Sequence, residues 1–335
     1  MNKCLTLLFV FAVGVTQSFA GAPQDHLVFE GDVGPGKGKH IVLLAGDEEY
    51  RSEEAMPLMA QLLAKQGFKC SVLFSLDDQG LVAPGNQKSL SHPEALNSAD
   101  AIVMSLRFRN WPDATMEIFD NAFRRGIPIV ALRTSTHAFN IGGAWAKYSF
   151  NAKAETGWDR GFGRAVLGET WVNHHGHHKR EGTRTVVEAA NKDHDILNGV
   201  GEIFGTTDVY GANPPEDCTI LLRGQVTQTL EPDSPALDGG KNNPMQPVVW
   251  TRVYKNDDGK QNRIVTTTMG AATDLLDEDL RRLVANGVFW GLEMPVPDKI
   301  DVTVGDDYQP AMYSFGGFKK NKKPSDFIIQ SIQAK

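Results

Sequence analysis

Cysteine is scarce in this chain, and long hydrophobic runs are missing beyond its first residues. Only three of the 335 residues are cysteine, and Cys70 and Cys218 are the two that follow the N-terminal segment. Both lie in short apolar stretches typical of strands, so we expect buried free thiols, although an exported protein could form a disulfide. Neither has an activating neighbour, and we therefore expect no cysteine nucleophile.

Positive charge is also in short supply. The formal net charge is −7 for the whole chain. Nucleic-acid binding needs a basic surface, so we predict no nucleic-acid partner. Four lysines do cluster near the C-terminus, and we interpret this segment as a solvated loop: Lys319, Lys320, Lys322 and Lys323.

The first twenty residues have the features of a secretory signal peptide. Lys3 is followed by an apolar run from Leu5 to Val15, and Ser18-Phe19-Ala20 is a small-x-small cleavage site. The run is too short for a membrane span, which takes about 20 residues. We therefore predict cleavage near Ala20, export to the periplasm or the extracellular space, and no stable membrane insertion.

Strands and helices alternate along most of the remaining chain. After a leader at 21–37 rich in Gly and Pro, short apolar runs alternate with stretches of helical periodicity. Ser52 is predicted to cap the first helix, with Glu53 and Glu54 complementing its dipole. This order predicts one α/β domain over 38–293 with a doubly wound, mostly parallel sheet, followed by a polar tail at 294–335. The predicted strands are 40–45, 68–74, 101–106, 127–132, 185–189, 220–226, 248–254 and 263–268, and the predicted helices are 52–66, 112–125 and 276–288.

Polar side chains follow the first and third predicted strands. In a doubly wound sheet the ligand crevice lies at the carboxyl ends of the strands. Asp47, Glu48 and Tyr50 come directly after the first strand and could bind sugar hydroxyls, hold a metal or move protons. Arg107 and Arg109 follow the third strand and suit a carboxylate, a phosphate or sugar oxygens. These five residues are candidates for substrate binding, although the arginines could instead pair with the acids.

The fourth strand ends in Arg133-Thr134-Ser135-Thr136-His137. A strand, a sharp turn and a helix form the context of a nucleophile elbow, but arginine at the elbow cannot be a nucleophile. Ser135 lacks flanking glycines, so a serine hydrolase is disfavoured. We expect Arg133 and, further along, Asp208 to contact substrate, and His137 to face the same crevice as a catalytic residue.

Four of the nine histidines lie within five residues of a long loop. Histidine is the commonest metal ligand and exchanges protons near neutral pH. His175 and His177, or His174 and His178, could reach one centre. We therefore predict catalytic roles for His175 and His177, and a divalent metal such as zinc on the four histidines; a solvated loop is the alternative.

Several segments together resemble the trehalose-utilisation (ThuA-like) family of the class I glutamine amidotransferase-like fold, and most of all its exported planctomycete and verrucomicrobial members. The resemblance covers about residues 38–293. It implies a flavodoxin-like sheet with helices on both faces. The segments that carry it are 45–51, 107–109, 131–139, 168–178 and 266–270.

The resemblance also implies a role in disaccharide catabolism, including routes through 3-keto sugars. Amidotransferase chemistry needs a cysteine at the elbow, where this chain has Arg133, and a downstream His and Glu that Met269-Gly270-Ala271 does not supply. Our hypothesis is an exported enzyme that acts on a glycoside or oxidised sugar by acid–base or metal-assisted chemistry, of hydrolase, lyase or isomerase type. The alternative is a non-catalytic sugar-binding or scaffold protein.

Overall fold

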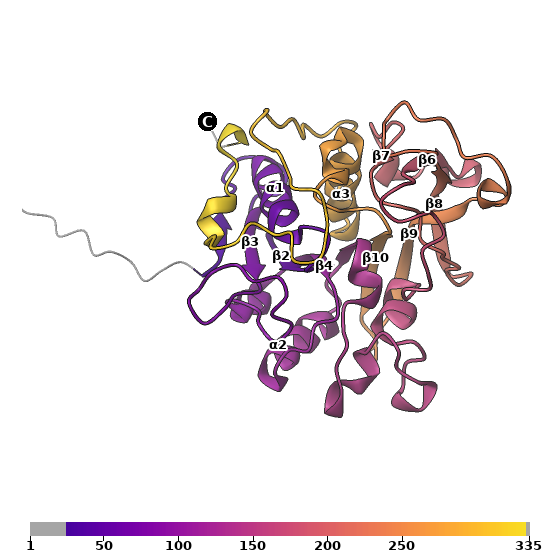
Figure 1. Cartoon of the computed structure of the whole chain (residues 1–335). Coiled ribbons are helices and arrows are strands. Elements are labelled where there is room, and N and C mark those ends of the chain that lie inside the picture. The colour runs from indigo at the N-terminus through magenta and orange to yellow at the C-terminus, as the bar shows by residue number, and fades with distance from the viewer. Residues whose placement is uncertain (1–24, 333–335) are drawn as a thin grey trace, which may run out of the picture.

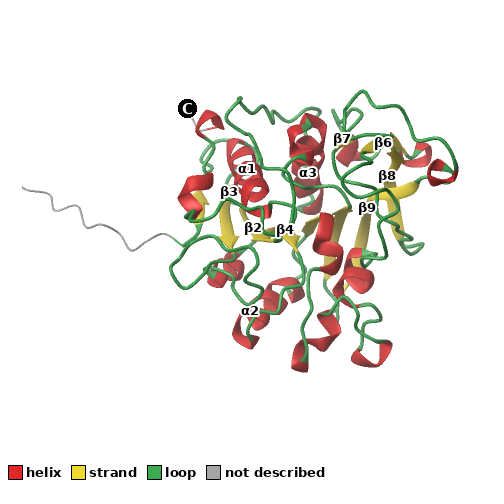
Figure 2. Ribbon diagram, viewed as in Figure 1, coloured by secondary structure: helices red, strands yellow, loops and turns green. Residues whose placement is uncertain are grey.

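The computed structural model describes residues 25–332, and these build one mixed sheet with helices on both faces (Figures 1 and 2). The predicted signal peptide lies outside the described residues. The spatial order of the ten strands is β1-β3-β2-β4-β5-β10-β9-β8-β6-β7. Their bounds are β1 Leu27–Phe29, β2 His40–Gly46, β3 Lys69–Phe74, β4 Ala101–Leu106, β5 Ile129–Leu132, β6 Thr183–Val187, β7 Phe204–Gly205, β8 Cys218–Val226, β9 Gln246–Lys255 and β10 Gln261–Thr267.

The sheet has a parallel half and an antiparallel half. Strands β3, β2, β4, β5 and β10 are parallel neighbours. Strand β10 then pairs antiparallel with β9, and β8, β6 and β7 continue in the same way. The sheet is therefore mixed rather than mostly parallel, because β9, β8, β6 and β7 all join it through antiparallel pairs. Strands β9 and β10 form a hairpin over the turn at 256–260.

Alternation of side chains along the central strands explains the layers. Ile41 and Leu43 of β2 belong to one apolar cluster, and Val42 and Leu44 belong to the other. The first cluster lies under α1 (Ser52–Lys65) and α3 (Glu278–Gly291), and the second lies under α2 (Asp113–Arg124). Figure 1 shows α1 and α3 on one side of the sheet and α2 on the other. All four β2 side chains are fully buried, as expected for a strand covered on both faces.

The first helix begins differently from the prediction. Arg51 is the N-cap residue of α1, in the left-handed region at φ 60°, and no side chain caps the helix. The Ser52 hydroxyl instead accepts a hydrogen bond from the Asp47 amide at 2.9 Å. Ser52 therefore closes the β2–α1 loop rather than capping the helix, because the tight turn aims its hydroxyl backward.

The predicted leader and tail both pack on the domain. The leader contributes β1, which pairs antiparallel with β3 at the sheet edge. The tail lies beside α1, where the Gln61 side chain bonds the backbone of Ile329 through both its amide nitrogen and its oxygen. Apolar tail side chains, among them Tyr308 and Phe327, are buried. The tail thus completes the hydrophobic core over α1.

The cysteines match the expectation of free thiols. Cys70 is buried in β3, and Cys218 is half-buried in β8. Five strands separate β3 from β8 in the sheet, so the two thiols are too far apart to pair. Burial raises the pKa of the Cys218 thiol to about 12, so it stays protonated. Between residues 25 and 332 no helix combines the length and the hydropathy of a membrane span.

Candidate functional site

The polar segments predicted at the strand ends do come together, and they enclose a cleft of about 300 Å³. The segments after β2, β4 and β5 form one wall, as the carboxyl ends of parallel strands should. The rest of the cleft is formed by the loop that carries the four clustered histidines (residues 168–178, the histidine loop), by the segment around residue 210 and by the tail. The residues that line the cleft are Glu49, Arg107, Phe108, His137, Trp171, His174, His178, Tyr210 and Phe315.

Asp208 is the buried centre of the site. Its side chain has no exposed surface. Each of its two carboxylate oxygens forms a hydrogen bond with one histidine of the loop, His174 or His178. His174 Nδ1 lies 2.7 Å from Oδ2, and His178 Nδ1 lies 3.1 Å from Oδ1. Backbone bonds from His175 and Gly176 to the Val209 carbonyl, each 2.9 Å, hold the histidine loop against this segment. These bonds fix the loop so that Trp171, His174 and His178, three and four positions apart, face the cleft.

Arg133 does not reach the cleft, contrary to the prediction of substrate contact. It occupies the elbow after β5 with φ 45°, and its side chain is fully buried. Its Nη2 lies 2.9 Å from Asp208 Oδ1, and its Nη1 donates to the carbonyls of Asp208 and Thr268, both at 2.7 Å. The guanidinium also lies 3.7 Å from the centre of the Tyr210 ring. Arg133 is therefore the counter-ion and anchor of Asp208.

The surroundings push the pKa values of the cleft histidines apart. Hydrogen bonds to Asp208 and Glu49 raise the pKa of His178 to about 9, so it is cationic at neutral pH. Burial, followed by the charges of Arg107 and Arg133, holds the pKa of His137 well below 6.5. Burial opposes ionisation of Asp208, but Arg133 and the two histidines outweigh it and lower the pKa of that carboxyl. A neutral and a charged imidazole in one cleft can divide the roles of base and acid.

The acids of the β2–α1 loop are engaged with the protein. Asp47 is buried, accepts the amides of Glu49 and Tyr50, and binds the Thr134 hydroxyl. Glu48 pairs with Arg107 and with Arg109, the latter at 3.0 Å. Desolvation raises the pKa of Glu48, and the charge of Asp47 adds to the effect.

Of the two predicted arginines after β4, only one borders the cleft. Arg109 is fully buried and donates to the Pro84 carbonyl at 3.0 Å, so it holds loops together. Arg107 lines the cleft, with its guanidinium 4.9 Å from the centre of the Phe315 ring. Tyr50 is buried behind the cleft, where burial raises its hydroxyl pKa to about 12. Of the residues predicted to bind substrate, Arg107 alone lines the cleft.

His175 and His177 lie away from the cleft, so the predicted set of four histidine ligands does not converge. The His175 ring nitrogen Nε2 lies 2.7 Å from the Lys241 carbonyl, and this residue borders a second, polar depression. His177 is exposed, and its backbone bonds Glu181. The two belong to the opposite face of the loop, because its backbone bonds to residue 209 fix its orientation.

A smaller group could hold a metal ion. One ligand atom from each of His174, His178 and Asp208 lies within 4.8 Å of the others. Two imidazoles and a carboxylate suit zinc and similar divalent ions. The same carboxylate, however, is already neutralised by the buried guanidinium of Arg133. The donor types fit a metal, while the charge at Asp208 is balanced without one.

The sequence does not predict five of the nine residues that line the cleft. Trp171 lies in the histidine loop, Tyr210 lies two residues after Asp208, and Phe108 lies between the two predicted arginines, so position alone could have suggested all three. Glu49 was passed over in favour of its neighbours. Phe315 lies in the tail, between Ser314 and Gly316, and no local signal marks it.

No protein-family model matches the chain, and no curated protein sequence matches it. Solved structures do. A protein from Parabacteroides merdae described as ThuA-like shares 13% identity over 83% of this chain and 98% of its own, with a TM-score of 0.52. A second, from Bacteroides uniformis, shares 14% identity over 83% of this chain and 95% of its own, with a TM-score of 0.46. The first likeness shows a common α/β fold.

Proposed function

We propose that the chain is a ThuA-like protein with a flavodoxin-like parallel core. In chain order the parallel strands are β2, β3, β4, β5 and β10, so their spatial order corresponds to the 2-1-3-4-5 arrangement of flavodoxin-like sheets. The motif segments of the sequence and the ThuA-like structural neighbours support the same family. Residues 1–20 support export, and the protein would then act on carbohydrates outside the cytoplasm.

We propose further that the protein is an enzyme of carbohydrate catabolism that acts on an oxidised sugar by acid–base chemistry. The observation that carries this proposal is the Asp208–His174–His178 cluster at the wall of an aromatic cleft. Aromatic side chains with a few convergent polar groups are the usual lining of a small-molecule site. Trp171 and Phe315 are partly exposed there and could stack on a sugar ring.

Each histidine of the cluster, His174 and His178, then has a role in the reaction. His174 directs Nδ1 at Asp208, so Nε2 is free to accept a proton, in the way a carboxylate orients a catalytic imidazole. In a 3-keto glycoside, the carbon next to the ketone carries an acidic hydrogen. His174 would take this proton, and the C–H electrons would form the enolate, which the charges of His178 and Arg107 stabilise.

The enolate would then expel the glycosidic oxygen. Its electrons form the new carbon–carbon double bond while the C–O bond breaks, and the departing oxygen takes back the proton held by His174. The products are an unsaturated keto sugar and an alcohol, so atoms and charge balance. Water added to the double bond would give net hydrolysis.

The carboxylates argue against an ordinary glycosidase. Most such enzymes need two carboxyl groups that flank the scissile bond. Glu48 is bound by two arginines, Asp47 by amides and a hydroxyl, and Glu49 by His178. Glutamine amidotransferase activity is likewise not part of the proposal, because Arg133 occupies the elbow where that chemistry requires cysteine.

The test is turnover of a 3-keto disaccharide and of its unoxidised parent by the mature protein. We expect elimination from the keto substrate alone, and a fall of about 10²–10⁴-fold in kcat for His174→Ala. His177→Ala, a change on the outer face of the same loop, should keep its rate. If His174→Ala and His177→Ala behave alike, the proposed base is wrong.

Two further measurements separate the alternatives. Calorimetry that shows tight sugar binding without turnover, unchanged in His174→Ala, would support a non-catalytic sugar-binding protein instead. Metal-assisted chemistry is favoured by the donor set of His174, His178 and Asp208. It predicts bound zinc in the purified protein and loss of turnover after chelation, whereas the acid–base proposal predicts that chelation has no effect.

A further inference from the structure

A second group of metal-ligand side chains lies away from the cleft, at the sheet edge formed by β1. Asp25 and His26 directly precede β1, and His92 directly precedes the short helix Pro93–Ser98 in the β3–β4 connection. The fold brings together imidazoles that are 66 positions apart in the sequence. One ligand atom from each of the three residues lies within 4.8 Å of the others.

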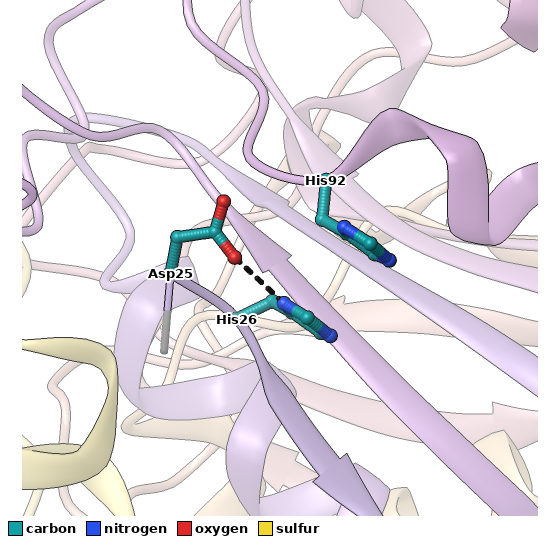
Figure 3. A group of neighbouring side chains, drawn as sticks. All are labelled: Asp25, His26 and His92. Carbon is teal, nitrogen blue, oxygen red and sulfur yellow. Dashed lines mark hydrogen bonds and ion pairs between the residues drawn. The ribbon is translucent and has the colours of Figure 1, made fainter. Parts of the chain in front are cut away.

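The two imidazoles have an unusual mutual orientation. Their ring centres are 4.1 Å apart, and their planes differ by 1° (Figure 3). Figure 3 shows both rings extending in the same direction, with the Asp25 carboxylate beside His26. The carboxylate lies 2.7 Å from His26 Nδ1. In this pair, like nitrogens lie next to each other (Figure 3), so both rings present a ligand atom at the same edge of the stack.

The chemistry of this group selects the kind of ion. We propose that Asp25, His26 and His92 bind one zinc ion or a similar divalent transition metal. Two imidazoles and a carboxylate suit zinc, nickel or copper and disfavour magnesium and calcium, which prefer oxygen. The carboxylate of Glu94, 4.0 Å from His92 Nδ1, adds negative charge beside the site.

Metal binding requires the two imidazoles to turn out of their parallel stack. Ligand atoms about 2.05 Å from a tetrahedral zinc lie about 3.3 Å from one another. An imidazole nitrogen binds a metal along the lone pair in its ring plane, so two parallel rings 4.1 Å apart must both rotate toward each other before their nitrogens can share one ion. Asp25 and His92 are half exposed, with side-chain exposures of 50% and 45%, so water can fill the remaining positions.

Such an ion would act as a clip on the sheet edge. Strand β1 has three residues and pairs with β3 alone. The metal would join the start of β1 to the β3–β4 connection across the edge. It would thereby protect an edge strand that otherwise depends on few hydrogen bonds.

The experiment is calorimetric titration of zinc chloride into the mature, untagged protein at pH 7.5. We expect the wild type to bind one equivalent more than the double variant His26→Gln/His92→Gln. His174→Ala alters the other candidate cluster and must keep the equivalent that the double variant loses. Equal stoichiometry in the wild type and the double variant would overturn the proposal.

Hydrogen exchange gives a second readout on the same proteins. Zinc should slow exchange of the amides of residues 27–29 in the wild type and leave it unchanged in the double variant. Lowering the pH to 5 should abolish binding, since imidazole must be deprotonated to bind a metal. Protection at β1 that is equal in both proteins would show that the histidines do not hold the ion.

Discussion

Asp208 links the two histidines of the proposed catalytic cluster to the buried arginine behind the cleft. It meets His174, His178 and Arg133, which come from the histidine loop and the β5 elbow. Removing one partner of a buried ion pair leaves the other uncompensated, which costs more than the pair contributes. A change at this one position therefore affects stability as well as catalysis.

Asp208→Asn should lower the free energy of unfolding by about 3 kcal/mol, because Arg133 stays buried without a counter-ion. Urea denaturation measures this difference. Asp217→Asn is the matched control, since Asp217 pairs with Arg252 at 2.8 Å but is more than half exposed. Exposed pairs contribute little. Equal losses in the two variants would show that burial of the Arg133 guanidinium does not require the Asp208 charge.

His178 makes stability depend on pH. Its pKa is about 9 in the folded protein, against an ordinary value of 6.5. A raised pKa contributes stability that is fully present below pH 6.5 and is lost as the pH rises through 9. The stability difference between wild type and His178→Gln should therefore shrink between pH 6.5 and 9.5 in chemical denaturation. A constant difference across this range would contradict the assigned protonation, and His177→Gln should show no such trend.

Residue types at strand ends predicted part of the site, and the missing part has a physical reason. Arg107, His137, His174 and His178 border the cleft as proposed. Arg133 is predicted to contact substrate from the turn after the fourth strand, but its guanidinium turns inward to the Asp208 carboxylate. Spacing along an irregular loop does not say which face a residue takes; the backbone bonds to residue 209 decide that, and they depend on the fold.

At the scale of elements, hydrophobic periodicity predicts the longer strands and helices but not the shortest strands. The eight predicted strands and three helices are all confirmed, since continuous apolar runs and helical stripes extend over several residues. The strands β1 and β7 have three and two residues, too few to show a period. Pairing direction is set by tertiary contacts, so the sequence does not show that β8, β6 and β7 pair antiparallel.

Gln61 of α1 is one of the buried anchors of the tail. Gln61 is buried and both donates to and accepts from the Ile329 backbone, at 2.7 and 2.8 Å. Gln61→Ala leaves a buried carbonyl and amide without partners and should cost about 2 kcal/mol in thermal or urea unfolding. Gln66→Ala is the control, because its bond to the Asp301 carbonyl is exposed. An equal cost for both would mean that the tail is anchored elsewhere.

The cleft wall supplied by the tail has its own test. Phe315 is 60% exposed and lies over Arg107, as expected for a platform that a flat ligand covers. Phe315→Ala should raise KM for the proposed keto substrate about fivefold with kcat unchanged, the loss of about 1 kcal/mol of stacking. Met312→Ala, also exposed but outside the cleft lining, should leave both constants unchanged. A fall in kcat instead would give Phe315 a role in the chemical step.

At the scale of the whole molecule, the tail belongs to the domain rather than following it. Its apolar side chains are largely withdrawn from water; they include Tyr308, Phe327, Ile329 and Ile332. Burial of each contributes about 1.5–3 kcal/mol, and their sum is comparable with the stability of a typical protein. A chain ending at residue 296 should therefore lose cooperative thermal unfolding in calorimetry. A sharp transition near that of the full chain would contradict this assignment.

The position of Phe315 in the chain also sets an order of events during synthesis. The ten strands, the three α-helices and the three histidines that line the cleft precede it, so they leave the ribosome first. A growing chain thus carries the proposed base and acid before the wall that covers them exists. Full affinity for the substrate would be reached only once the tail has packed on the sheet, so a chain released before Phe315 would bind the substrate more weakly.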